Sequence, residues 1–250
     1  MPRIALLADG HLTSDDPSRL EILVRTLTDL PEDTAAVYIL GDLFEVWLGV
    51  ARRQAHVEQV AEALAGLRRR GVKLGYVEGN RDFRIARGPY RDLFDVASAD
   101  KLVERFGSRT LHLTHGDLIN TADRQYRAWR LFAKHALAPA ALTLLPDKAA
   151  VGLGHRLERR LRTTNIKHKG YFPTEACRAY TRAALREGAD VVVAGHFHQA
   201  VRLEVEDGAR RGLFISLPFW HAEPRIVWID ENGRVEGLMQ PGASPGPEGR

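Results

Sequence analysis

Five short apolar runs in this sequence each end in a cluster of glycine, acidic, amide or histidine residues. The runs have the length of buried strands, and they lack the regular alternation expected of a sheet with one face in water. They are the segments Ile4 to Ala8, Ala36 to Leu40, Val72 to Val77, Thr110 to Thr114 and Val191 to Ala194. We therefore predict five buried strands that are covered on both faces.

Helical patterns separate the early runs, at Pro17 to Leu30 and at Gln54 to Arg70. This succession of strand and helix predicts an α/β sheet with right-handed crossovers. Later in the chain, only short turns separate three further apolar segments, which predicts antiparallel strands. These segments are Val201 to Val205, Gly212 to Leu217 and Arg225 to Ile229.

The region between the fourth and fifth apolar runs, residues 121–186, is nearly all helical in pattern. It is far longer than the dozen or so residues that a crossover needs. Its apolar middle, Ala136 to Leu145, is flanked by arginine-rich segments. We expect a core made of residues 1–120 and 187–236, a helical lid inserted at 121–186, and a disordered, Pro/Gly-rich tail at 237–250.

The polar clusters lie where the strands are predicted to stop, which is the edge where open α/β sheets bind ligands. Two Asp, one Asn and four His residues occupy these ends: Asp9, His11, Asp42, Asn80, His115, His196 and His198. Any one of them has an ordinary structural explanation, such as a helix cap or a turn. Their recurrence at five strand ends favours a metal site. Seven mixed oxygen and nitrogen ligands suit two ions of Mn²⁺, Fe²⁺ or Zn²⁺ sharing one carboxylate.

Composition narrows the possible partners. The net charge of +4 fits an acidic partner, such as a phosphorylated small molecule, an anionic membrane surface or nucleic acid. Nucleic acid is the least favoured, because only 8% of the residues are aromatic and the basic residues are not interleaved with them. A single cysteine, Cys177, allows neither an internal disulfide nor a cysteine metal site. With no uninterrupted apolar stretch near 18 residues, we expect a soluble, cytoplasmic protein.

The polar clusters also carry a family resemblance. Asp9-x-His11, Gly41-Asp42, Gly79-Asn80-x-Asp82, His115 and Gly195-His196-x-His198 match, in this order, the motifs of calcineurin-like metallophosphoesterases. The resemblance covers about residues 1 to 230. It implies an α/β (α+β) fold: a β-sandwich flanked by helices in four layers, α/β/β/α.

The same resemblance implies roles for the clustered residues. One ion would be held by Asp9, His11, Asp42 and His198, and the other by Asp42, Asn80, His115 and His196, with Asp42 bridging the two. The cofactors would be two divalent ions, with Mn²⁺ the expected metal. A metal-bridged hydroxide would attack phosphorus in line. The residues expected to be catalytic are Asp42, Asn80, Arg81 and His115.

Within the family, four segments resemble the subgroup that hydrolyses UDP-2,3-diacylglucosamine in lipid A synthesis. They are Gly41 to Gly49, Gly79 to Phe83, His115-Gly116-Asp117 with Asp123, and Trp220-His221. The resemblance implies substrate contacts at Asn80, Arg81, Asp123, Asn165, His168 and His196. The chain departs from the subgroup at His168, where lysine is usual, at Val50-Ala51, where two aspartates are usual, and in the arginine-rich run near Leu161, where a lid serine is usual.

The guanidinium of Arg81 indicates which type of phosphate substrate the site would cleave. An arginine stays charged and cannot protonate a leaving group, but it can hold phosphate with two hydrogen bonds. A phosphate leaving group, with a pKa of about 6, needs no proton donor. Arg81 therefore favours cleavage of a diphosphate over that of an alkyl ester. A structural ion pair with Asp82 is the simpler alternative.

These expectations lead to a hydrolase that releases UMP and 2,3-diacylglucosamine 1-phosphate from a lipid-linked nucleotide sugar. It would work at an anionic membrane surface, peripheral on the inner face of the inner membrane. A relative that acts on another diphosphate or a phosphodiester is the main alternative. A non-enzymatic binding scaffold is a third possibility, against which the complete ligand set argues.

Overall fold

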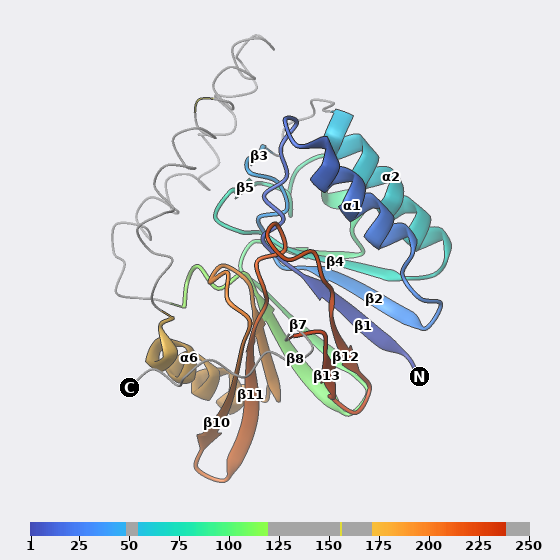
Figure 1. The fold of residues 1–250 in the computed structure, drawn as a ribbon. Helices are drawn as coiled ribbons and strands as arrows, with labels where there is room; N and C mark the ends of the chain where they lie inside the picture. The colour runs from blue at the N-terminus through green and yellow to red at the C-terminus, as the bar shows by residue number, and fades with distance from the viewer. Residues whose placement is uncertain (49–54, 120–155, 157–171, 239–250) are drawn as a thin grey trace.

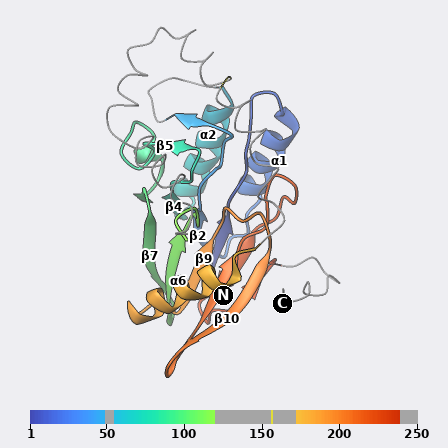
Figure 2. The same ribbon diagram turned by 90° about the vertical axis from the view of Figure 1, so that its left-hand side faces the viewer.

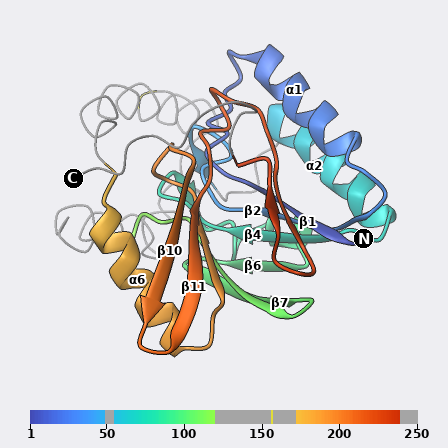
Figure 3. The ribbon, with the colours of Figure 1, turned by 60° about the horizontal axis from the view of Figure 1, so that its bottom comes forward.

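The computed structural model describes residues 1–48, 55–119, 156 and 172–238. These residues form two β-sheets packed face to face, with helices on the outer face of each sheet (Figures 1 and 3). Three apolar clusters separate the layers: one between α1, α2 and the first sheet, one between the two sheets, and one between the second sheet and α6. The expected four-layer α/β/β/α sandwich is confirmed.

The first sheet has the order β13-β12-β1-β2-β4-β6. Its strands are β1 (Arg3–Leu7), β2 (Thr34–Ile39), β4 (Lys73–Val77), β6 (Val96–Ser98), β12 (Val227–Asp230) and β13 (Val235–Glu236). Strands β1, β2, β4 and β6 are parallel neighbours, and β12 runs antiparallel to β1. The parallel strands therefore deliver the segments after β1, β2 and β4 to one edge.

The second sheet has the order β10-β11-β9-β8-β7. Its strands are β7 (Lys101–Phe106), β8 (Arg109–Thr114), β9 (Val191–Ala194), β10 (Val201–Asp207) and β11 (Arg210–Ser216). Strands β8, β9 and β11 are parallel, whereas β7 and β10 pair antiparallel at the two edges. Two short strands, β3 (Trp47–Leu48) and β5 (Asp82–Phe83), pair in parallel outside both sheets.

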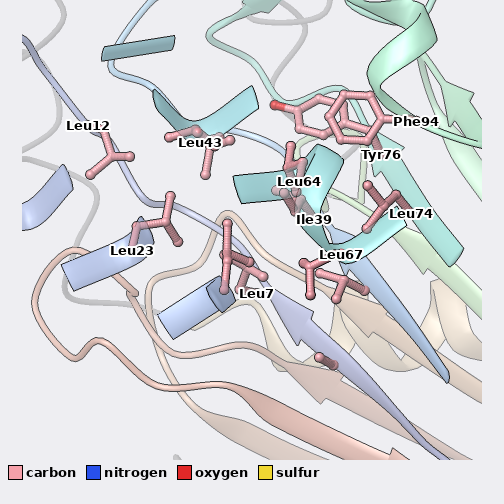
Figure 4. Packing of buried hydrophobic residues seen from close by; sticks show 14 of the residues in the cluster. Leu7, Leu12, Leu23, Ile39, Leu43, Leu64, Leu67, Leu74, Tyr76 and Phe94 are labelled. Carbon is pink, nitrogen blue, oxygen red and sulfur yellow. The ribbon is translucent and has the colours of Figure 1, made fainter. Parts of the chain in front are cut away.

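Helix α1 (Pro17–Thr28) begins where the sequence supplies a cap and a proline: the side chain of Asp16 accepts a hydrogen bond from the Arg19 amide at 3.1 Å. It packs beside α2 (Ala55–Arg69) on the first sheet. Leu23, Leu64 and Leu67 of these helices meet strand residues such as Leu7, Ile39 and Leu74 in the outer core (Figure 4). A short 3-10 helix, η1, spans Arg91–Leu93.

Helix α6 (Thr174–Arg186) covers the second sheet (Figure 2). Its residues Cys177, Ala184 and Leu185 are buried against Val192 and Phe214. Of the predicted lid, only residue 156 and residues 172–186 are described, and most of the predicted tail lies beyond the described residues.

The five predicted strands are confirmed as β1, β2, β4, β8 and β9, and both early helices are present. The late segments differ in part from the expected run of antiparallel strands. Strand β11 is antiparallel to β10 but parallel to β9, and β12 crosses to the first sheet. Strands β6 and β7 were not predicted; β7 alternates exposed and half-buried residues at a sheet edge. Within the described ranges, no helix is long and apolar enough to cross a membrane.

Candidate metal centre

The seven predicted ligands follow the carboxyl ends of five strands from both sheets. Asp9 and His11 follow β1, Asp42 follows β2, and Asn80 follows β4. His115 follows β8, and the His196–His198 pair follows β9. Since these strands are parallel within each sheet, their ends meet at one end of the sandwich. The structure brings all seven side chains together there.

The backbone of this region is strained. Five of the seven residues have positive φ angles: Asp9 (58°), His11 (43°), Asp42 (51°), His196 (69°) and His198 (57°). In the described part of the chain, Arg84 is the only other non-glycine residue with a positive φ. Each such conformation costs on the order of 1–3 kcal/mol, persists only where the surrounding structure enforces it, and is common at functional sites. The strain therefore marks the same residues that the sequence pattern selects.

Two glycines allow the ligand segments to approach each other. A Cβ atom on Gly79 would lie 2.1 Å from Asp42 Oδ1, and one on Gly195 would lie 2.9 Å from Asp9 Oδ2. Any side chain at either position would push a carboxylate out of place. The glycines before Asn80 and His196 are thus required by packing, rather than by turn formation alone.

The first group of ligands surrounds a buried carboxylate oxygen. Asp9 Oδ1 has no hydrogen-bond donor among the described residues, and it lies 3.3 Å from His198 Nε2 and 3.8 Å from His11 Nε2. The two histidine Nε2 atoms are 3.4 Å apart, and His11 Nε2 is 3.9 Å from Asp42 Oδ2. An orphaned carboxylate oxygen facing two imidazole nitrogens fits a divalent cation.

The second group of side chains also includes Asp42. Its Oδ2 atom is 3.7 Å from His115 Nε2. The side-chain oxygen of Asn80 lies 3.0 Å from His115 Nε2 and 3.1 Å from His196 Nδ1. Asp42 Oδ2 is thus shared by the two groups, since it also approaches His11. The donor set fits two ions that share one carboxylate.

Hydrogen bonds fix the tautomers of two histidines. His115 Nδ1 donates to the backbone oxygen of Leu40 at 2.7 Å, and His11 Nδ1 donates to Glu45 Oε2 at 3.0 Å. In the neutral form of each ring, Nε2 therefore carries no proton and faces the centre. Outer partners of this kind raise ligand basicity and hold the ring in orientation.

The pKa values reflect burial and the mutual influence of carboxylates and imidazoles in the cluster. Burial raises the pKa of Asp9, but the neighbouring His198, His115 and His11 outweigh it and lower that pKa. Burial would lower the pKa of His115, yet the carboxylates of Asp42 and Asp9 raise it. Burial and the charge of His115 lower the pKa of His196 to about 4. Asp9 is thus ionised and His196 neutral near pH 7, which are the states that bind metal.

Asp82 serves as a brace between two ligand segments. Its Oδ2 atom accepts hydrogen bonds from the amides of Asp42 (2.9 Å) and Gly79 (2.7 Å) and from the hydroxyl of Tyr76 (2.8 Å). Burial and the nearby charge of Asp42 raise the pKa of Asp82 to about 7. The fully buried carboxyl thus joins the ends of β2 and β4 instead of facing a ligand.

Arg81 has a partner that the sequence did not indicate. Its buried guanidinium pairs with the carboxylate of Glu45, while its Nε lies 3.7 Å from Asp42 Oδ2. The pairing of β3 with β5, including a hydrogen bond from Trp47 N to Arg81 O at 3.0 Å, sets these segments side by side. The alternative of an Arg81–Asp82 ion pair is not found among the described contacts. Glu45 instead links His11 to Arg81.

Sequence reasoning also missed Phe219, in the segment after β11. Its ring stacks on His198 with centroids 4.1 Å apart and planes inclined by 5°. No spacing pattern points to it, because it lies on a segment that carries no ligand. Of the predicted substrate contacts, Asn80, Arg81 and His196 are in the cluster, whereas Asp123, Asn165, His168 and the Val50-Ala51 departure lie outside the described residues.

The chain is similar to known proteins over most of its length. The chain is 29% identical over 238 residues to a protein named UDP-2,3-diacylglucosamine hydrolase from Pseudomonas savastanoi pv. phaseolicola, covering 92% of this chain and 93% of that protein. A protein of the same name from Xanthomonas campestris pv. campestris is 28% identical over 235 residues, covering 91% and 95%. A solved archaeal phosphodiesterase is 16% identical with a TM-score of 0.47, covering 94% of this chain and 97% of the other.

The family comparison covers most of the chain. The family described as calcineurin-like phosphoesterase matches residues 2–200, which include all seven clustered ligands. With its four-layer sandwich and the ligand cluster at the strand ends, the chain belongs to the calcineurin-like phosphoesterase family, whose chemistry is the hydrolysis of phosphate esters.

Proposed function

We propose that this protein cleaves the diphosphate of UDP-2,3-diacylglucosamine, giving UMP and 2,3-diacylglucosamine 1-phosphate. The observation that carries the proposal is the convergence of Asp42 with six other side chains of the types that bind metal ions. The similarity to proteins named UDP-2,3-diacylglucosamine hydrolase, which extends over more than nine-tenths of the chain in both comparisons, supports the choice of substrate.

The proposed centre holds two divalent ions, with Mn²⁺ the expected metal. Asp9, His11 and His198 would hold one ion, Asn80, His115 and His196 the other, and Asp42 both. Bound there, the ions would polarise the phosphoryl oxygen and activate water for attack. The protein's own part is to keep Asp9 ionised, to present the Nε2 atoms of His11 and His115, and to hold Asp42 between the two groups.

Arg81 supplies a permanent positive charge beside the bridging carboxylate. Its guanidinium is held by Glu45, and its Nε lies 3.7 Å from Asp42 Oδ2. We propose that this charge stabilises the phosphate groups of the substrate, with Asn80 and His196 as further contacts. Because the departing group of a diphosphate is itself a phosphate, it needs no general acid. Asp123, Asn165 and His168 complete the proposed substrate set.

The lipid part of the proposed substrate suggests where the protein acts and what the predicted lid contacts. A diacylated sugar resides in a membrane, so the protein would act as a peripheral enzyme on the cytoplasmic face of the inner membrane. Its net charge of +4 favours an anionic surface. The predicted lid carries the apolar segment Ala136 to Leu145, which we propose contacts the acyl chains.

The proposal is tested by incubating the purified protein with Mn²⁺ and UDP-2,3-diacylglucosamine and measuring UMP. Parallel samples contain a chelator, the Asp42→Ala variant, or an activated aryl phosphodiester in place of the substrate. Chelator-sensitive UMP release that disappears in Asp42→Ala is the expected result. Hydrolysis of the aryl phosphodiester without UMP release would keep the metal chemistry and reject the substrate, favouring the alternative of another diphosphate or phosphodiester.

A further inference from the structure

Within the described part of the chain, the ring of His198 lacks the hydrogen bond that holds the rings of His11 and His115 in place. His11 and His115 each use Nδ1 to donate a hydrogen bond to a fixed oxygen, at 3.0 Å and 2.7 Å. His198 Nδ1 has no such partner among the described residues. Its Nε2 atom points at Asp9 Oδ1, 3.3 Å away. Another contact must therefore set the plane of this ring.

Phe219 supplies that contact. The phenyl ring lies flat on the imidazole of His198, with centroids 4.1 Å apart and planes inclined by 5°. The same phenyl ring meets His11 edge-on, with centroids 5.5 Å apart and planes at 69°. A single half-buried side chain thus touches both histidines of the group around Asp9.

The backbone around Phe219 is anchored to the ligand segments themselves. Leu217 N donates to the oxygen of Ala194 at 2.8 Å, and His221 N donates to the oxygen of Asp9 at 3.2 Å. The oxygen of Phe219 accepts hydrogen bonds from two amides that follow it, and the next residue, Trp220, is fully buried. These hydrogen bonds attach the segment to the ends of β1 and β9, and so hold the phenyl ring beside the cluster.

We propose that Phe219 is a positioning residue that holds the His198 ring and strengthens cation binding at its Nε2. A divalent ion at Nε2 withdraws electrons from the imidazole and makes that ring more positive. The face of a phenyl ring is negative and attracts positive charge within about 6 Å. The stack thus favours the ion-bound ring over the free one. This inference rests on the two-metal centre of the proposed function and assigns it a further residue.

The test is a titration of metal-free protein with Mn²⁺ in competition with a fluorescent chelator, which resolves the number of ions bound and the affinity of each. The variants are Phe219→Ala, Phe219→Leu, which keeps bulk without a π face, and Phe219→Tyr, which keeps the ring. Phe106→Leu is the matched control, because this half-buried phenylalanine pairs with Arg109 at the far end of β8 from His115.

We expect the wild type to bind two ions. Phe219→Ala and Phe219→Leu should weaken one of them by roughly tenfold or more, the scale seen for outer partners of metal ligands, and leave the other unchanged. Phe219→Tyr and Phe106→Leu should bind as the wild type does. In metal-free protein, the His198 ring proton resonances, shifted upfield by the stacked phenyl, should move downfield in Phe219→Leu.

The test distinguishes failure of the proposed role of Phe219 from failure of the proposed metal centre. A wild type that binds two ions, with Phe219→Leu binding both equally well, would overturn the role of Phe219 and leave the proposed function intact. Equal weakening of both ions in Phe219→Leu would also overturn it, since it would show a general loosening. A wild type that binds no Mn²⁺ would reject the proposed metal centre itself. Far-ultraviolet circular dichroism verifies that each variant is folded.

Discussion

Glu45 accepts a hydrogen bond from His11 Nδ1 at 3.0 Å while its other oxygen pairs with the guanidinium of Arg81. One buried carboxylate thus orients a predicted metal ligand and forms an ion pair with the arginine beside Asp42. Burial raises the pKa of Glu45, but His11 and Arg81 outweigh it and lower that pKa, so the carboxylate is ionised at neutral pH. Glu45 therefore links His11, a predicted metal ligand, to Arg81, whose positive charge we propose acts on the substrate.

Replacing Glu45 should disturb both the orientation of His11 and the pairing of Arg81. In Glu45→Gln the acceptor for His11 loses its charge, so we expect metal affinity and turnover to fall roughly 10–100-fold. Glu45→Ala should also destabilise the fold by about 3–5 kcal/mol, because it removes the carboxylate that pairs directly with the buried Arg81 guanidinium and leaves, among the described residues, only Asp42, 3.7 Å away. Chelator competition and urea unfolding measure the two effects. Glu21→Ala, which breaks an exposed pair with Arg25, is the control and should change stability by less than about 1 kcal/mol.

Gly79→Ala should disable the centre. The added methyl carbon would lie 2.1 Å from Asp42 Oδ1 and 2.6 Å from Asp42 N, so the bridging carboxylate must move. We expect the loss of at least one bound ion, counted by metal analysis of the folded protein, and the loss of activity. Gly66→Ala is the matched control. It lies in α2, where an added Cβ would meet, in the described part of the chain, only the end of the Arg69 side chain, at 3.6 Å, and it should stabilise the protein by about 0.5–1 kcal/mol. Unchanged metal content in Gly79→Ala would contradict the proposed packing.

Arg81→Ala should discriminate between substrates. Cleavage of a diphosphate should fall far more than cleavage of an activated aryl phosphodiester, because only the first presents a second phosphate for the positive charge to stabilise. The ratio of kcat/KM for the two substrates, measured in wild type and variant, reports this difference directly. Equal losses on both substrates would restrict Arg81 to its structural pairing with Glu45.

The buried His112, which is not one of the seven clustered residues, should make the stability of the fold depend on pH. Its Nε2 lies 3.0 Å from the Tyr180 hydroxyl, where burial and the charge of Lys101 lower its pKa from 6.5 to about 4. The unfolded chain therefore binds a proton at higher pH than the folded protein does. Stability contributed by neutral His112 is complete above pH 6.5 and is lost as the pH falls toward 4.

Urea unfolding at pH 7 and pH 5 checks this sign. The wild type should lose more unfolding free energy between the two pH values than His112→Gln does, since the variant lacks the titrating ring. Other titrating groups are common to both proteins and cancel in the comparison. An equal loss in the two proteins would show that His112 titrates normally in the folded state.

The clustering of the seven proposed ligands could be predicted from the sequence because the information is local. Each ligand follows a short apolar strand, and neighbouring parallel strands end at the same edge of a sheet. The division of those strands between two sheets could not be obtained in the same way. Strand β12 pairs with β1, more than 200 positions earlier in the chain, and nothing local to either strand specifies that partner.

The residues around the ligands were harder to predict for the same reason. Glu45 and Arg81 meet because β3 pairs with β5, and Phe219 reaches His198 because the segment after β11 is fastened to Asp9 and Ala194. These contacts depend on tertiary packing, and the residue types carry no distinctive spacing. Arg81 was recognised by its position after Asn80, yet its ion-pair partner became visible only in the fold.

Anomalous diffraction from crystals of the protein soaked in Mn²⁺ would show directly whether Asp42 bridges two ions. We expect two anomalous peaks. One should lie among Asp9, His11 and His198, the other among Asn80, His115 and His196, and Asp42 should contact both. A single peak, or two peaks of which only one contacts Asp42, would contradict the proposed centre.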